Sequence, residues 1–213
     1  MTTLIIIRHG YSVTNAANRF TGQTDVALTD EGRRQAERVA DYLVPRVRID
    51  AIFSSDLSRA VDTARPTAER LGLEIHRDPA LRELAMGVWE GMLFDDVDRL
   101  YADDVAARKR NVYHPCPGGE STAEMFTRIK DALFKIAAEN EGKTVMIVTH
   151  GGAVRIINCL ASGGDVTETV KFSNCANAAI SFYRFEEGAL HAEEVNITAH
   201  LADAAANANA ALQ

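Results

Sequence analysis

The sequence contains few cysteines and no long apolar run, and both shortages exclude classes of protein. Its three cysteines, Cys116, Cys159 and Cys175, are odd in number and widely spaced, which argues against a disulfide framework and against a Cys-x-x-Cys metal site. We therefore expect reduced, structural thiols. No apolar run approaches the roughly 18 residues that a membrane-spanning helix needs. The chain also begins without a basic segment followed by a long apolar stretch, so we expect no signal peptide and a cytoplasmic protein.

Positive charge is scarce as well. Lys and Arg number 23 against 30 Asp and Glu, which gives a formal net charge of −7 at pH 7. Such a surface repels nucleic acid and anionic lipid, so we expect neither nucleic acid nor a membrane as a partner. An anionic ligand must instead bind in a local pocket of positive charge. The sequence leaves the oligomeric state open.

Strands and helices alternate along the 213 residues, 46% of which are hydrophobic. Residues 4–7 (Leu-Ile-Ile-Ile) predict a strand that is buried on both faces, as in a parallel sheet. Residues 51–53 and 144–149 predict two further strands, and residues 178–185 and 189–195 predict a hairpin. The pattern predicts an α/β fold: a three-layer sandwich with a mostly parallel central sheet flanked by helices.

Helix signals lie between the predicted strands. Thr29 or Asp30 can cap a helix that ends before Pro45. A second helix is expected to start near Ser58 and to be kinked at Pro66, because proline lacks the N–H of a regular helix. These helices supply the outer layers that a parallel sheet requires.

The second half of the chain contains a third helix and a segment that leaves the sheet. Ser121 and Glu124 form an S-x-x-E capping box for the helix. Before it, about residues 92–117 predict a small, partly helical excursion over the active site. No repeat or linker divides the sequence, so we expect a single domain over residues 1–213, with about 202–213 a weak helix or frayed tail.

Two of the predicted strands end on a histidine followed by a glycine, at His9-Gly10 and His150-Gly151. One histidine at a strand end is more often structural, but α/β sheets bind ligands beyond the carboxyl ends of their strands. Gly10 and Gly151 leave room for a ligand to approach the backbone, and the turns or helices that follow offer free N–H groups to anions. The pair therefore indicates a ligand site at this edge.

Two arginines are predicted at the same edge. Arg8 precedes His9, and Arg59 lies in the first turn of the helix that follows residues 51–53. Arginine binds a phosphate with two parallel hydrogen bonds. Two arginines and two histidines at one edge predict a pocket for a phosphoryl group.

Other designs for phosphoryl transfer do not fit the sequence. A cysteine nucleophile needs an arginine six residues later, where Thr122, Asp165 and Ser181 stand instead. The P-loop-like EGKT at residues 141–144 precedes its strand and lacks the earlier glycine. Histidines and carboxylates do not cluster at metal-ligand spacing. We therefore expect neither a metal nor another cofactor.

A histidine nucleophile is the remaining design. An imidazole nitrogen that attacks phosphorus forms a phosphohistidine, which divides one hard displacement into two easier ones. The leaving alkoxide then needs a proton from a carboxylic acid. The stretch LRELAMGVWEGM offers Glu83 and Glu90 on a segment that leaves the sheet.

Six motifs, in order along the chain, resemble the histidine phosphatase superfamily, which includes the cofactor-dependent phosphoglycerate mutases and related phosphatases. They are RHG after a buried strand, TG at Thr21-Gly22, SSDLSRAVDTA, LRELAMGVWEG, PGGES and VTHGG. The resemblance covers about residues 1–185. The sequence departs from it at Tyr11, where the family usually has Glu or Gln.

The resemblance implies roles for individual residues. His9 would be the phosphorylated nucleophile and Glu83 the proton donor and acceptor. We expect His9 to be neutral, because two arginines and a protonated His150 would disfavour a further positive charge. The residues that hold the phosphoryl oxygens or line the substrate side would be Arg8, Asn15, Thr21, Gly22, Arg59, His150 and Gly151.

Within the superfamily, the sequence favours a metal-independent phosphomonoesterase that acts on a small phosphorylated metabolite. Mutases have a long segment between the glutamate motif and the later helix, whereas only residues 92–117 separate WEG from PGGES here. A cofactor-dependent phosphoglycerate mutase is the alternative. A non-catalytic phosphate-binding scaffold is less favoured, because His9, Glu83 and His150 are all present. Which phosphate ester is used stays open.

Overall fold

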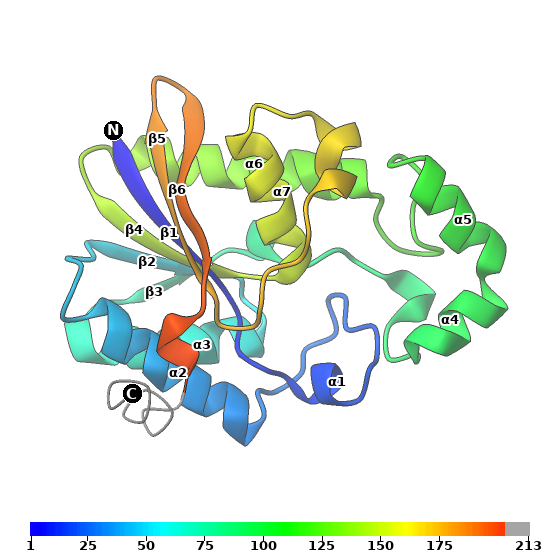
Figure 1. Cartoon of the computed structure of the whole chain (residues 1–213), viewed down its shortest axis with the longest axis horizontal. Helices are drawn as coiled ribbons and strands as arrows, with labels where there is room; N and C mark the ends of the chain where they lie inside the picture. The colour runs from blue at the N-terminus through cyan, green and yellow to red at the C-terminus, as the bar shows by residue number, and fades with distance from the viewer. Residues whose placement is uncertain (203–213) are drawn as a thin grey trace, which may run out of the picture.

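The computed structural model describes residues 1–202, which form one six-stranded sheet in the order β3-β2-β4-β1-β5-β6 (Figure 1). Strands β3, β2, β4 and β1 run parallel, and β5 and β6 continue the sheet as an antiparallel hairpin beside β1. The predicted mostly parallel sheet is confirmed. The tail expected from about residue 202 lies outside the described residues, apart from residue 202 itself. The strands are β1 (Thr2–Arg8), β2 (Ala51–Ser54), β3 (Ile75–Arg77), β4 (Thr144–Thr149), β5 (Ile180–Glu186) and β6 (Ala189–Ile197).

Strand β1 lies inside the sheet because its side chains are apolar on both faces. Leu4 and Ile6 belong to one hydrophobic core, whereas Ile5 and Ile7 belong to the other, and none is more than 1% exposed. Burying one such side chain contributes about 1.5–3 kcal/mol before the loss of conformational entropy. This alternation fixes which side of the strand faces which layer.

Helices cover both faces of the sheet and give the three predicted layers (Figure 1). The core of Ile5 and Ile7 is closed by α2 (Asp30–Leu43) and α3 (Ser58–Leu71). The opposite core is closed by α6 (Thr122–Glu139) and α7 (Gly151–Ala161). The shorter elements are α1 (Val13–Ala16), α4 (Phe94–Leu100), α5 (Ala102–Arg110), and the 3₁₀ helices η1 (Pro79–Leu81), η2 (Gly87–Trp89), η3 (Val166–Lys171) and η4 (Ala199–Leu201).

Two of the predicted helix caps are present. Thr29 caps α2 by accepting a hydrogen bond from the Gly32 N–H at 3.1 Å, and Ser121 and Glu124 form the capping box of α6. Pro66, in contrast, does not interrupt α3, which continues to a left-handed C-cap at Gly72. The proline lies within a helix whose packing against the sheet outweighs the hydrogen bond that its ring removes.

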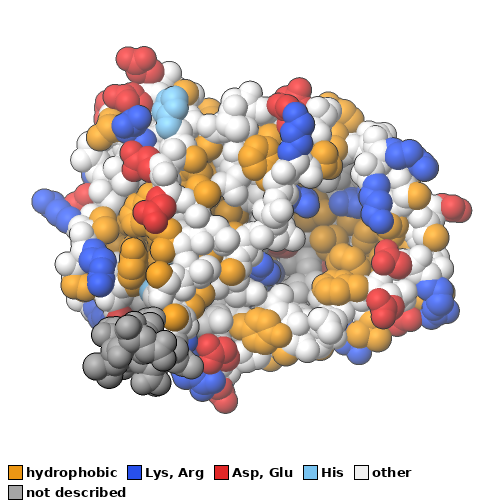
Figure 2. Space-filling view, viewed as in Figure 1, with side chains coloured by type: hydrophobic (Ala, Val, Ile, Leu, Met, Phe, Trp, Pro, Cys, Tyr) orange, Lys and Arg blue, Asp and Glu red, His pale blue; other side chains and the backbone are white. Residues whose placement is uncertain are grey.

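The excursion predicted over residues 92–117 contains α4 and α5. In Figure 1 both helices stand apart from the sheet, beyond the carboxyl ends of β1 and β4. Val97 of α4 is fully buried and joins Trp89 in the core that α6 and α7 close. Figure 2 shows a hollow in this face, between α7, α1 and the excursion, in which a basic side chain is visible.

Two expectations about the whole chain concern membranes and thiols. Within residues 1–202, every helix is too short or too polar to cross a bilayer. Cys116, Cys159 and Cys175 are buried and unpaired, as expected. Burial raises the pKa of Cys116 and that of Cys175 to about 11, so both remain thiols at neutral pH.

Candidate active site

His9 lies directly after β1 and is only 5% exposed. Its main-chain N–H donates to the Thr149 carbonyl at 2.9 Å, which joins the end of β1 to the end of β4. Its ring Nδ1 lies 2.8 Å from the carbonyl oxygen of Gly10. A carbonyl can only accept, so Nδ1 carries the ring proton and Nε2 keeps its lone pair. The neutral ring can therefore attack through Nε2.

His150 follows β4, and its ring centroid lies 5.1 Å from that of His9. The side chain is fully buried, and its Nε2 is 2.8 Å from the Ser55 hydroxyl oxygen. The Leu57 N–H donates to the same oxygen at 3.4 Å, so the Ser55 hydroxyl proton is free to point to Nε2. With the Ser55 hydroxyl as the donor to Nε2, the ring proton of His150 lies on Nδ1.

Arg8 and Arg59 are held by main-chain carbonyls and not by carboxylates. Arg8 Nη1 donates to the Cys175 carbonyl at 2.5 Å. Arg59, which is 1% exposed, donates to the carbonyls of Thr24 and Gly22 at 2.9 and 2.8 Å. Neither guanidinium forms an ion pair with another residue of the described chain. Both charges therefore remain available to an anion.

Three buried nitrogens of these side chains lack a hydrogen-bond partner within residues 1–202: Arg8 Nε, Arg59 Nε and His150 Nδ1. Buried polar atoms are nearly always paired, so three unpaired donors around one histidine require an explanation. A phosphoryl group carries three strong acceptor oxygens. An anion bound at this edge would bring acceptor oxygens to this group of side chains.

Burial and the two arginines keep both imidazole rings neutral. Burial, followed by the charges of Arg59 and Arg8, holds the pKa of His9 well below its ordinary value. Burial, followed by Arg59 and His9, does the same to the pKa of His150. The expectation of a neutral His9 agrees with this. The expectation of a protonated His150 is wrong for the unliganded chain, in which the arginines alone supply positive charge to the pocket.

Glu83 reaches the same edge from the segment after β3. Its Oε2 accepts from the Gly152 N–H at 3.0 Å and its Oε1 from the Leu84 N–H at 2.9 Å. Gly152 lies in the first turn of α7, where free N–H groups favour a carboxylate. A side chain there would place its Cβ 2.3 Å from Glu83 Oε1. Glycine at this position therefore lets the carboxylate approach the helix.

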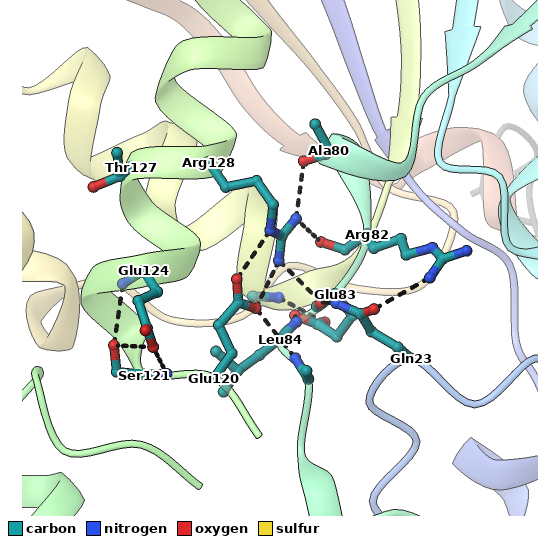
Figure 3. Close-up of polar contacts among 12 residues, drawn as sticks. Gln23, Ala80, Arg82, Glu83, Leu84, Glu120, Ser121, Glu124, Thr127 and Arg128 are labelled. Carbon is teal, nitrogen blue, oxygen red and sulfur yellow. Dashed lines mark hydrogen bonds and ion pairs between the residues drawn. The ribbon is translucent and has the colours of Figure 1, made fainter. Parts of the chain in front are cut away.

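The main chain around Glu83 is held by Arg128 of α6 (Figure 3). Arg128 donates to the carbonyls of Ala80, Arg82 and Glu83 at 2.9, 3.0 and 3.3 Å. Its guanidinium also forms a two-pronged pair with Glu120, with N···O distances of 2.9 and 2.7 Å. These contacts fix the backbone that carries Glu83.

Glu90, the other carboxylate in the motif, connects two loops. Its Oε1 accepts from the main-chain N–H groups of Gln23 and Met86 at 2.9 and 3.0 Å, and its Oε2 accepts from the Thr24 hydroxyl at 2.5 Å. Both oxygens are thus used in fixing the loop of residues 21–24 beside Glu83. Glu90 is thereby tied to the loop that orients Arg59, whereas Glu83 is tied to the start of α7 beside His150.

Thr21 and Gly22 lie in that loop and act on the pocket indirectly. The Thr21 hydroxyl is 2.6 Å from the hydroxyl of Thr14. Gly22 has a left-handed φ of 54°, and its carbonyl accepts from Arg59. The loop therefore orients Arg59.

Asn15 is joined to His9 through a residue that the sequence did not single out. Asn15 Oδ1 accepts from the Ser12 N–H at 3.1 Å within the capping box of α1. Asn177 Nδ2 lies 3.3 Å from the same oxygen and donates to the His9 carbonyl at 3.1 Å. Asn177 thus connects the strand end at His9 with the loop that carries Asn15.

The glycines after each histidine make room for protein atoms. A Cβ at Gly10 would lie 2.6 Å from the Gly32 carbonyl oxygen of α2, so glycine lets the chain after β1 approach α2. Room for a ligand at Gly10 stays a prediction. A Cβ at Gly151 would lie 3.3 Å from Arg8 Nε. Gly151 therefore gives space to a side chain of the pocket.

Three supporting residues were missed by sequence reasoning. Ser55 and Thr63 both lie within SSDLSRAVDTA, where their side chains bond to His150 and to the Gly10 N–H at 2.8 and 2.9 Å. Their polar side chains at fixed offsets from Arg59 were a usable signal. Asn177 lies in a loop without a motif, so no comparable signal pointed to it.

We expect neither His9 nor His150 to protonate near pH 6.5 in the unliganded protein. Nitrogen-15 NMR of labelled histidine should show both rings neutral well below that pH. Since the unfolded rings bind protons that the folded rings do not, the free energy of unfolding should fall as pH decreases from about 7, by up to about 1.4 kcal/mol per pH unit for each ring. His9→Asn should remove its share of this slope. A folded-state titration of either ring near pH 6.5 would contradict the neutral pair.

Metal binding has no evident location in the described chain. Within residues 1–202, no three His, Cys, Asp or Glu side chains are grouped as a metal ion requires. The cations of the pocket are the guanidinium groups of Arg8 and Arg59.

Comparison with known proteins yields one family and several close structural matches. The sequence model of the histidine phosphatase superfamily (branch 1) matches residues 4–198. Phosphoserine phosphatase 1 of Hydrogenobacter thermophilus is 33% identical over 95% of this chain and 96% of its own length. A probable phosphoglycerate mutase of Serratia proteamaculans is 39% identical over 76% of this chain and 74% of its own.

A solved structure agrees with these sequence matches. Phosphoserine phosphatase from Entamoeba histolytica, determined in complex with phosphoserine, superposes with a TM-score of 0.80 at 30% identity, covering 95% of this chain and all of that one. The matches extend across the sheet, both helical layers and the candidate site.

Proposed function

This chain belongs to the histidine phosphatase superfamily, and we propose that it hydrolyses phosphate monoesters of small hydroxy acids through a phosphohistidine on His9. One observation carries the proposal. Arg8, Arg59 and His150 lie at the same edge as a neutral His9, and each has a buried nitrogen without a hydrogen-bond partner among residues 1–202. The enzyme is a phosphatase of small phosphorylated metabolites, and its chemistry passes through side chains of this one chain.

In the first step, His9 Nε2 attacks phosphorus while the ester P–O bond breaks. Nε2 has the lone pair for this attack because Nδ1 donates to the Gly10 carbonyl. Arg8, Arg59 and His150 hold the phosphoryl oxygens and offset the negative charge on them. Glu83, protonated, gives its proton to the leaving oxygen, which departs as the free alcohol.

In the second step, water takes the place of the alcohol. Glu83, now ionised, accepts a proton from the water as its oxygen attacks phosphorus. The N–P bond breaks, inorganic phosphate forms, and His9 returns to its neutral state with Glu83 protonated. The same carboxylate thus serves as acid and then as base, which its fixed backbone supports.

The substrate class rests on the chemistry of the relatives. Phosphoserine phosphatase and phosphoglycerate mutase, the relatives named above, both act on a phosphorylated hydroxy acid that carries a carboxylate. Their shared feature supports a carboxylate-bearing monoester as the substrate of this chain.

A phosphoglycerate mutase is the second candidate, because some of the relatives carry that description. The short excursion of α4 and α5 between residues 92 and 117 favours hydrolysis, since it leaves less chain to enclose the phosphoenzyme from water.

We expect water to be the normal acceptor, and hydrolysis to be independent of 2,3-bisphosphoglycerate. The measurement is release of inorganic phosphate from phosphoserine and 3-phosphoglycerate, with and without 2,3-bisphosphoglycerate and in the presence of a chelator. Isomerisation of 3- to 2-phosphoglycerate is followed in the same samples. Stimulated isomerisation well above the rate of hydrolysis would make the chain a mutase.

We also propose that the enzyme acts in the cytoplasm as a single domain. The unpaired thiols of Cys116, Cys159 and Cys175 suit a reducing compartment. The net charge of −7 supports a small-molecule partner over nucleic acid or an anionic membrane.

A further inference from the structure

A small pocket of about 150 Å³ adjoins the candidate active site at Glu83. Glu83 and Gly152 form part of its wall, and these two residues also join the carboxylate to α7. The alcohol portion of a substrate whose leaving oxygen receives the proton of Glu83 would therefore lie beside this pocket.

The wall of the pocket combines polar and apolar side chains. Arg155 of α7, Thr122 of α6 and Asn174 supply polar side chains. The apolar side chains are those of Leu84, Met86, Met125 and Ile156. Such a lining suits a short carbon chain that ends in a polar group.

Arg155 is the unusual member of this wall. Its Nε is buried and has no hydrogen-bond partner within residues 1–202. The structure also records no ion pair for its guanidinium among those residues. In this respect Arg155 resembles Arg8 and Arg59, the other two arginines with a buried, unpaired Nε close to Glu83 and α7.

The charge of the pocket selects among anions. Arg155 supplies one positive charge, whereas Glu83, on the same wall, becomes negative once it has given up its proton. A second phosphate carries two negative charges, of which a single guanidinium matches only one. A single carboxylate matches one guanidinium in charge and in its two-pronged geometry.

We propose that Arg155, assisted by Thr122 and Asn174, binds the carboxylate of the substrate's hydroxy-acid portion. The inference rests on the proposed function, because it assumes that the ester is cleaved at His9 beside Glu83. It assigns the preference for acidic esters to one named side chain.

The test compares pairs of substrates that differ in one carboxylate. The first pair is 3-phosphoglycerate and glycerol 3-phosphate, and the second is phosphoserine and phosphoethanolamine. We expect Arg155→Gln to lower kcat/KM for each acid by about 10- to 100-fold, mainly through KM, because a charged hydrogen bond is lost. For glycerol 3-phosphate and phosphoethanolamine, which lack the carboxylate, kcat/KM should change by less than about 3-fold. Arg155→Lys should restore part of the loss.

Arg65→Gln is the matched control, since Arg65 is an exposed arginine of α3 that forms an ion pair with Asp62. This variant should leave kcat/KM unchanged for all four substrates. Equal losses on both members of a pair would show a structural role and overturn the proposal. If the native enzyme prefers the acids and Arg155→Gln keeps that preference, the subsite alone is wrong. If the native enzyme shows no preference, the proposed substrate class fails with it. Should Arg155→Gln not fold, Arg155→Lys carries the same comparison.

Discussion

Replacing His9 with alanine should abolish the phosphoenzyme and lower turnover by at least about 10⁴-fold, the scale on which loss of a nucleophile acts. Arg8 and Arg59 are cations, and Nε2 of His150 faces the Ser55 hydroxyl, so none of these three side chains can replace His9 as the nucleophile. Rapid quenching with a labelled substrate should trap phosphate in the native enzyme, in a bond that is stable to alkali and labile to acid. His9→Ala should trap none.

Two controls accompany this experiment. His191→Ala makes the same substitution at an exposed histidine of β6, and it should label and turn over normally. Thermal unfolding of His9→Ala should confirm that the variant is folded. Label that persists in folded His9→Ala would place the nucleophile elsewhere.

Replacing Glu83 with glutamine should separate esters by the basicity of their leaving groups. An alkyl phosphate expels a strongly basic alkoxide, so loss of the acid should slow phosphoenzyme formation by about 10²–10⁴-fold. A nitrophenyl phosphate expels a weakly basic phenolate that scarcely needs the proton. The burst phase before steady state, measured for both esters, isolates this step from the later attack by water.

The comparison also needs a folded variant. Both oxygens of Glu83 accept main-chain N–H groups, from Leu84 and Gly152, and an amide has only one oxygen to offer. Thermal unfolding of Glu83→Gln should confirm that the variant is folded. If the burst of the folded variant slows equally for both esters, Glu83 is not the acid. Glu69→Gln, at an exposed position of α3, should alter neither burst.

The parts of the fold that were predictable are those in which the local pattern and the tertiary environment agree. Leu4 to Ile7 are apolar on both faces of a strand, and the structure buries both faces. Ser121 and Glu124 bond to each other's main-chain N–H groups at the N-terminus of α6, so this cap needs only four consecutive residues. The ends of β1 and β4 were predictable for the same reason, because an apolar run that stops at a histidine and a glycine marks the point at which the strand leaves the core.

The remaining features depend on contacts that no local pattern specifies. Strand β3 has three residues and lies at the edge of the sheet, with two of them exposed, so it carries almost no periodic signal. Pro66 lies inside α3, which runs on to Leu71 as expected, and the kink predicted there stays a prediction. Arg128 supports Glu83 from a helix nearly fifty residues further along the chain, and Asn177 reaches His9 from the far end of the sequence. Such pairings exist only once the sheet has formed.

The order of strands in the sheet has a consequence for how the protein is made. Strand β4 lies between β1 and β2, so the first two strands of this sheet to be synthesised are not neighbours in it. At about 5–20 residues per second, the roughly 140 residues between β1 and the end of β4 take about 7–30 s to synthesise. During that interval the apolar face of Leu4 to Ile7 has no native partner strand. The nascent chain should therefore depend on chaperones until β4 emerges, and ribosomes stalled before residue 149 should yield aggregating fragments in place of a folded half.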